Sequence, residues 1–155
     1  MHPILIGTGS FSNLERGNVV SISSMETNYP TFQKLVPRDI SYQDEIKRLK
    51  RVREEVVNLP YLKELEDDFI KDYYQSVLKH LYIEGLMKEM RNRFGEEIIL
   101  ATEEDADEFN HRRIFADYLE LETGVYIPEV VTKTDSIQKI QPVRYKKRLR
   151  KIIGS

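Results

Sequence analysis

The sequence predicts a mainly α-helical protein, a small bundle of three to four helices with an extended N-terminal arm that contains short β segments and a basic C-terminal tail. Apolar residues recur at helical spacing between residues 41 and 121. The 40 residues up to that point are rich in Ser, Thr, Asn, Gly and Pro, and the last residues are basic. This pattern divides the chain into an arm over residues 1–40, a helical core domain over 41–131 and a tail over 132–155.

The N-terminal arm carries turn signals and little core pattern. Gly7-Thr8-Gly9-Ser10 is typical of a turn, and residues 19–23 are typical of a short strand. Pro30 and Pro37 keep the following segment extended. A stretch of this length without a core element is unusual inside a compact domain. We therefore expect an arm or a functional loop.

A first helix is predicted from Ser41, a good N-cap residue that is followed by acids in the first turn. The apolar residues of this segment recur at spacings of four and three and form one narrow stripe, made of Tyr42, Ile46, Leu49, Val52 and Val56. Asn58 and Pro60 are expected to end the helix. A stripe of this width packs against one partner helix.

A long second helix is predicted over residues 61–94, where the apolar face is wide. The acidic residues 66–68 indicate a break within it. Gly85 costs about 1 kcal/mol relative to alanine inside a helix, so we expect it at a close helix crossing. Gly95 is predicted as the C-cap of this helix.

The third part of the core is predicted as a short strand followed by a helix. Residues 97–101 are apolar and are typical of a strand. Thr102 and Asp105 resemble a capping pair, which predicts a helix from there to residue 121, ended by Gly124. Residues 125–131 are predicted to be extended.

Composition limits the class of protein. A chain of 155 residues supports one domain with extensions, and its net charge of −2 points to no particular partner. The absence of cysteine excludes disulfides, thiolate metal sites and thiol nucleophiles. The longest apolar runs are too short to cross a bilayer. We expect a soluble intracellular (cytoplasmic) protein without a membrane partner, or a virion protein if the source is viral.

Motifs for catalysis are absent, so the sequence predicts a protein that is not an enzyme, with no catalytic residue and no cofactor. No Gly-x-Ser-x-Gly elbow and no phosphate-binding glycine motif occur. The runs of acids, including residues 103–105, are interpreted as solvated acids at helix starts. His80 with Glu84, and Glu108 with His111, supply at most half of a helical two-metal set. No metal ligand is therefore predicted.

The basic tail is the one feature predicted to contact a partner. Its candidate contact residues are Arg144, Tyr145, Lys146, Lys147, Arg148, Leu149, Arg150, Lys151 and Ile152. One interpretation is that the apolar side docks on a neighbouring subunit while the bases meet acids such as 64–68 or 103–108 of another copy. A second is that the bases bind nucleic-acid phosphates. A third is an inert, solubilising terminus. Docking is favoured.

These observations predict a non-enzymatic structural or adaptor subunit of a larger multiprotein assembly, either a homo- or a hetero-oligomer. A virion component such as a bacteriophage neck, tail or baseplate protein fits helices with long arms, and that context is a fold-level analogy. The alternative is a nucleic-acid-binding accessory factor that acts through the basic C-terminal tail.

Overall fold

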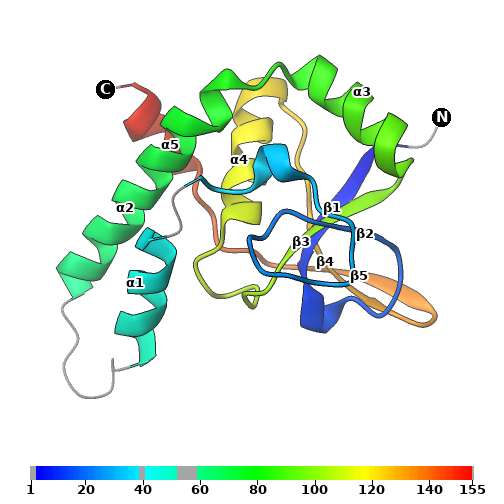
Figure 1. Ribbon diagram of the computed structural model, residues 1–155, viewed down its shortest axis with the longest axis horizontal. Helices are drawn as coiled ribbons and strands as arrows, with labels where there is room; N and C mark the ends of the chain where they lie inside the picture. The colour runs from blue at the N-terminus through cyan, green and yellow to red at the C-terminus, as the bar shows by residue number, and fades with distance from the viewer. Residues whose placement is uncertain (1–2, 39–40, 52–58, 155) are drawn as a thin grey trace.

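The computed structural model describes residues 3–38, 41–51 and 59–154 (Figure 1). Five strands form one sheet: β1 (Leu5–Ser10), β2 (Asn18–Ser21), β3 (Ile98–Thr102), β4 (Glu129–Lys133) and β5 (Ser136–Ile140). The α-helices are α1 (Ser41–Arg51), α2 (Leu59–Ser76), α3 (Ile83–Phe94), α4 (His111–Thr123) and α5 (Lys146–Ile153). Short 3-10 helices are η1 (Phe11–Asn13), η2 (Gln33–Leu35) and η3 (Leu78–His80).

The sheet has the strand order β2-β3-β1-β4-β5. The first four strands run parallel, and β5 pairs with β4 in the antiparallel direction as a hairpin that projects from the body (Figure 1). β1 is central, and its residue Thr8 pairs with Leu100 of β3 and Glu129 of β4. The parallel pairings therefore join segments that lie far apart in the sequence.

The prediction of a mainly α-helical bundle with an N-terminal arm was wrong, because the fold is mixed α/β with 47% helix and 20% strand. The segment interpreted as a turn-rich arm supplies β1 and β2. A Cβ atom on Gly7 would lie 2.9 Å from Val130 Cγ1, and one on Gly9 would lie 2.9 Å from Leu14 Cδ2. The glycines thus permit close packing on a central strand and do not form a flexible turn.

Two hydrophobic clusters lie on opposite faces of the sheet. The larger includes Val20, Leu100 and Phe115 together with side chains of α2, α3 and α5. The smaller cluster consists of Leu14, Val19, Ile99, Ala101 and Val130. Loops of the N-terminal segment pack against it, with the rings of Phe11 and Tyr29 stacked at 5.5 Å. Both faces are covered, as parallel sheets require.

The C-terminal segment is part of the domain. It forms β5 and α5, and α5 packs against α4 and α2. Tyr145 and Leu149 are both 0% exposed within the main core. The tail was predicted to dock its apolar side on a neighbouring subunit; in the structure its own chain covers Tyr145 and Leu149, whereas Ile152 is half-buried and Ile153 is exposed.

Helix boundaries agree with the sequence at some positions and differ at others. Gly95 and Gly124 have φ of 90° and 77° and act as the predicted C-caps of α3 and α4. The long second helix breaks at residues 77–82 and not at the acids 66–68. Gly85 accommodates the ring of Tyr82, which lies where a Cβ atom would be.

The helix predicted from Thr102 begins instead at His111. Asn110 is its N-cap, and the side-chain oxygen of Asn110 accepts a hydrogen bond from Arg113 N at 2.9 Å. α1 begins at Ser41 as predicted, and Ile46 of its stripe is buried. The rest of that stripe, together with Asn58, lies outside the side chains that the structure describes.

No helix in the described part of the chain is both long enough and apolar enough to cross a membrane. The strands β3, β2 and β4 correspond to segments that were predicted to be extended. The fold therefore retains several predicted elements in an architecture that was not predicted.

The buried side of α5 generates a prediction on stability. Replacing Leu149 with Ala should lower the free energy of unfolding by about 2–5 kcal/mol, because it removes a fully buried leucine and leaves a cavity. Urea denaturation measures the effect. The exposed Lys147→Ala variant is the control and should change stability by less than about 0.5 kcal/mol. A Leu149→Ala effect as small as the control would contradict the packing of α5.

Candidate functional site

Polar side chains gather where the parallel strands end. Ser10, Ser21 and Thr102 are the last residues of β1, β2 and β3, and these strands are aligned so that the three ends meet at one edge. Open α/β sheets bind ligands outside the carboxyl ends of their strands. We define the carboxyl edge as these strand ends, the loop over residues 103–110, the start of α4 and the face of α1 that covers them.

A buried ion pair forms the floor of the carboxyl edge. Arg112 Nη2 lies 2.6 Å from Glu129 Oε2, and Arg112 Nε lies 3.2 Å from Glu129 Oε1. Arg112 Nη1 donates to Thr102 Oγ1 at 2.6 Å and to the carbonyl oxygen of Glu104 at 2.9 Å. Thr8 Oγ1 donates to Glu129 Oε1 at 2.6 Å. Since both charged groups are paired, this cluster serves as a structural clamp.

Arg113 is buried beside this clamp. Its Nη1 donates to Thr8 Oγ1 at 2.9 Å and to Ile127 O at 2.7 Å. Its Nε and Nη2 have no hydrogen-bond partner among the described residues, and Nη2 lies 3.8 Å from Asp117 Oδ1. Burial lowers the pKa of Arg113, and the nearby Asp117 opposes that shift. Water molecules that bridge Arg113 to Asp117 would satisfy these donors.

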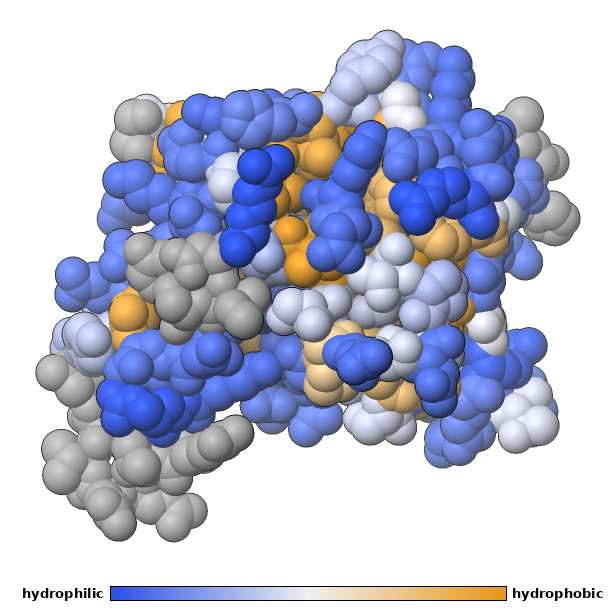
Figure 2. Space-filling model, viewed as in Figure 1, coloured by the Kyte–Doolittle hydropathy of each residue, from blue (hydrophilic) through white to orange (hydrophobic). Residues whose placement is uncertain are grey.

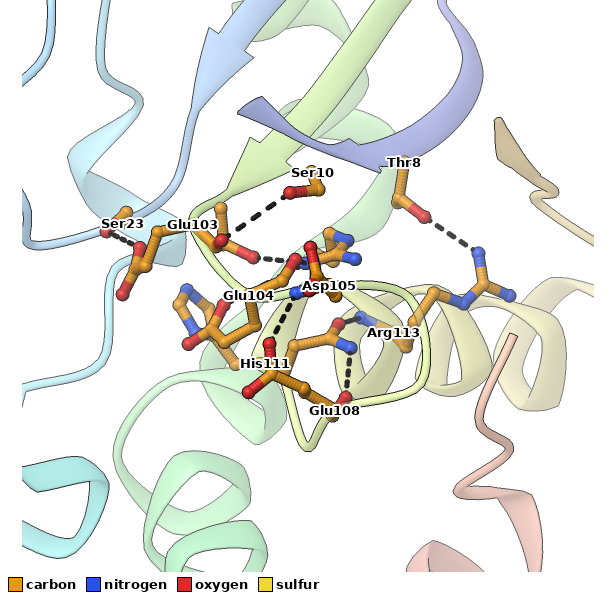
Figure 3. Close-up of polar contacts among 12 residues, drawn as sticks. Thr8, Ser10, Ser23, Glu103, Glu104, Asp105, Glu108, His111 and Arg113 are labelled. Atoms are coloured by element: carbon orange, nitrogen blue, oxygen red, sulfur yellow. Dashed lines mark hydrogen bonds and ion pairs between the residues drawn. The ribbon is translucent and has the colours of Figure 1, made fainter. Parts of the chain in front are cut away.

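Glu103 is a charged, partly buried carboxylate of the edge. Its Oε2 accepts from Ser23 Oγ (Figure 3), and its Oε1 lies 2.9 Å from Lys47 Nζ. Burial opposes ionisation of Glu103, but the hydrogen bonds from Ser23 and Lys47 outweigh it and hold its pKa below the ordinary value. Glu103 thus supplies a paired, partly exposed negative charge to the edge.

Glu104 is the contrasting carboxyl group. It is buried, and desolvation, followed by repulsion from Glu103, raises its pKa. Its Oε2 lies 3.4 Å from Gln43 Nε2, whereas its Oε1 has no hydrogen-bond partner in the described structure. Arg112 Nη1 lies 3.8 Å from that oxygen, too far for a hydrogen bond. Glu104 Oε1 is therefore an unfilled acceptor at the edge.

His111 is held in its neutral form. Burial lowers its pKa to about 4. Its Nε2 lies 2.6 Å from Ile22 O, so Nε2 carries the proton, and Nδ1 accepts from Gln43 Nε2 at 3.3 Å. The ring links the start of α4 to the end of β2 and to α1. Figure 3 shows His111 and Glu104 on the same side of the loop that carries Glu103.

The predicted tail contacts mostly bind the protein's own acids, and Tyr145 reaches the carboxyl edge at Asn110. Arg144 Nε lies 3.2 Å from Asp117 Oδ1, and Arg148 Nη2 lies 2.7 Å from Asp67 Oδ1. Lys146 pairs with Glu120, Tyr145 OH accepts from Asn110 N, Ile152 is half-buried, and Lys147, Arg150 and Lys151 are exposed. Acids 64–68 were predicted as partners on another copy, and here residues 66 and 67 of the same chain serve that role.

The residues weighed as metal ligands do not converge. His80 Nε2 lies 3.0 Å from Gln75 O at the surface, and Glu84 accepts from Tyr82 OH. Glu108 accepts from Asp105 N, which orders the loop, while His111 is buried. Among the described residues, no group of three or more ligand side chains is placed to hold a metal ion.

The carboxyl edge was not predicted from the sequence. The serines of the N-terminal segment were interpreted as loop residues, and residues 103–105 as solvated acids. A usable signal exists in the sequence, because Ser10, Ser21 and Thr102 each end a short apolar or small-residue segment. That signal becomes informative only once the three segments are recognised as parallel strands.

Comparison with protein-family models, with curated proteins and with solved structures finds no match to this chain. The function must therefore be inferred from the residues of the carboxyl edge themselves.

The buried ion pair between Arg112 and Glu129 generates a prediction on stability. Glu129→Gln should lower the free energy of unfolding by roughly 3–5 kcal/mol, because the buried charge of Arg112 loses its counter-charge. Glu122→Gln, the same change at an exposed position of α4, should have almost no effect. Urea denaturation of both variants measures the difference, and equal stability of the two would exclude the clamp.

Neutral His111 makes stability depend on pH. Between its folded pKa of about 4 and its ordinary value of about 6.5, the unfolded chain binds more protons than the folded chain. The stability present above pH 6.5 should therefore fall as the pH drops, by roughly 3 kcal/mol by pH 4. The raised pKa of Glu104 changes stability in the opposite direction. The contribution of His111 is therefore taken as the difference between the wild type and His111→Gln, since both proteins contain Glu104.

Urea midpoints recorded from pH 7.5 to pH 4 should show a smaller acid-induced loss in His111→Gln than in the wild type. The exposed His80→Gln variant is the matched control and should follow the wild type. Identical pH profiles for all three proteins would show that His111 is not held neutral.

Proposed function

We propose that this chain is a ligand-binding α/β domain that holds a small polar molecule at the carboxyl edge. The observation that carries the proposal is Glu104 Oε1, a buried carboxyl oxygen without a hydrogen-bond partner among the described residues. Leaving such an acceptor unfilled costs about 1–3 kcal/mol. A ligand that donates a hydrogen bond to it recovers that free energy.

The charges of the carboxyl edge specify the ligand further. Glu103 is paired with Lys47, Arg112 is paired with Glu129, and Glu104 is biased toward its neutral form. The buried groups around Glu104 Oε1 are therefore paired or neutral, whereas Asp105, Asp107 and Glu108 of the same loop are exposed acids that form no ion pair with any described residue. These acids disfavour an anion, so the site favours an uncharged or zwitterionic ligand that carries O–H or N–H donors. Ser12 is exposed and the Lys47 side chain is 39% exposed. These residues therefore lie on the side of the carboxyl edge that faces solvent.

The prediction of a structural or adaptor subunit stays a prediction. Its argument rested on two long arms, and both segments are part of the folded domain. Nucleic-acid binding through the tail also stays a prediction, and the bases that remain for it are Lys147, Arg150 and Lys151, which form no ion pair with any described residue. Ligand binding at the carboxyl edge is compatible with either role.

Thermal unfolding in the presence of uncharged sugars, nucleosides and amino acids tests the proposal. A compound present at 100 times its dissociation constant adds about 2.7 kcal/mol of stability, which raises the midpoint by roughly 5–10 °C for a chain of this size. Glu104→Met keeps the side-chain volume and removes the acceptor, so it should abolish the rise.

The control for this experiment is Glu122→Met, which makes the same change at an exposed site and should retain the full rise in midpoint. The proposal fails if no compound of these classes stabilises the wild type. It also fails if Glu104→Met responds to the active compound as strongly as the control does.

A further inference from the structure

A cavity lies on the helical side of the molecule, apart from the carboxyl edge. Its volume is about 850 Å³, it is partly open to solvent, and it is lined by residues of η2 and the segment after it, the end of α2, η3 and the first turn of α3. Pockets that bind small organic molecules usually measure about 300–1,000 Å³. In Figure 2, apolar surface shows between hydrophilic side chains in the upper middle of the view, where Figure 1 places η2 and the α2–α3 junction.

The charged residues that line this cavity are basic. Lys34, Arg38 and His80 contribute to it, and none of the lining residues is acidic. Lys34 pairs with Glu89 outside the lining, and Glu89 also contacts Arg93. Arg38 is exposed and forms no ion pair with any residue that the structure describes. The bases therefore give the cavity a positive potential that the described acids offset only in part.

The start of α3 adds to this potential. Tyr82 precedes the helix and makes no side-chain capping hydrogen bond, so the amides of the first turn are not capped by it. Tyr82, Gly85 and Leu86 line the cavity. The amino end of a helix carries a partial positive charge, which favours an anionic group. Glu84 of the same turn, which accepts from Tyr82 OH, offsets part of this charge.

The remaining lining is apolar. Val77 and Leu86 are 5% and 4% exposed, and Val36 and Pro37 are also buried. The ring of Tyr82 is 71% exposed and stands at the rim. A simple inorganic anion would leave this apolar surface in contact with water. An apolar group attached to the anion would cover the surface, which is favourable because it removes apolar area from water.

We propose that this cavity binds a small amphipathic organic anion, in which a carboxylate, sulfonate or phosphate is attached to an apolar or aromatic body. The anionic group faces Arg38 and Lys34, and the body lies against Val77 and Leu86. This site shares none of its lining residues with the carboxyl edge, so it stands independently of the ligand proposed there.

Anilinonaphthalene sulfonate is the probe for this proposal, and N-phenylnaphthylamine, which has the same aromatic body without the sulfonate, is its uncharged counterpart. Fluorescence titration of the native full chain at pH 7 should show saturable binding of one sulfonate probe per chain. Arg38→Gln and Lys34→Gln should each weaken it by about tenfold, since each removes a charge-assisted contact. Binding of the uncharged probe should change by less than about twofold.

Two further variants locate the site. Lys79→Gln removes a charge from the same region outside the cavity lining and should leave both probes bound as in the wild type. Ser76→Phe places a ring in the cavity and should abolish binding of both probes, with circular dichroism confirming that the variant is folded. The proposal is overturned if the native chain does not bind the sulfonate probe, or if Arg38→Gln and Lys34→Gln bind it as tightly as Lys79→Gln.

Discussion

The buried ion pair between Arg112 and Glu129 connects elements that the sequence keeps far apart. Arg112 belongs to α4 and also binds Thr102 of β3, while Glu129 belongs to β4 and accepts from Thr8 of β1. Two desolvated charges are tolerated only when their remaining hydrogen-bonding groups are satisfied. The pair therefore fixes the position of α4 over the sheet and, through it, the position of His111 at the carboxyl edge.

Consecutive residues of one loop have opposite electrostatic environments. Glu103 meets a hydroxyl and an ammonium group, which stabilise its charge, whereas Glu104 is buried beside an amide, which does not. Gln43 connects Glu104 to neutral His111. Because Gln43 and Lys47 lie one turn apart on α1, a single helix face contacts both environments. The placement of α1 thus determines how the edge is divided into a charged part and a neutral part.

Local sequence signals predicted the local features of this fold. The start of α1 at Ser41 and the glycine caps at Gly95 and Gly124 depend on neighbouring residues and were predicted. The central strand β1 was missed because a strand buried on both faces shows no alternation and because its glycines resemble a turn. The carboxyl edge was missed for a related reason: its members come together only through parallel pairing such as that of Thr8 with Leu100.

The central position of β1 has a consequence for how the chain is made. Its six residues, Leu5–Ser10, are synthesised before those of its neighbours β3 and β4, which come about 90 residues later or more. At a synthesis rate of about 5–20 residues per second, β1 waits roughly 5–20 seconds for its first partner strand. During that interval α2 and α3 can form from local contacts, whereas β1 has both edges open to other chains. Nascent copies of this protein on neighbouring ribosomes are therefore at risk of pairing with one another through β1.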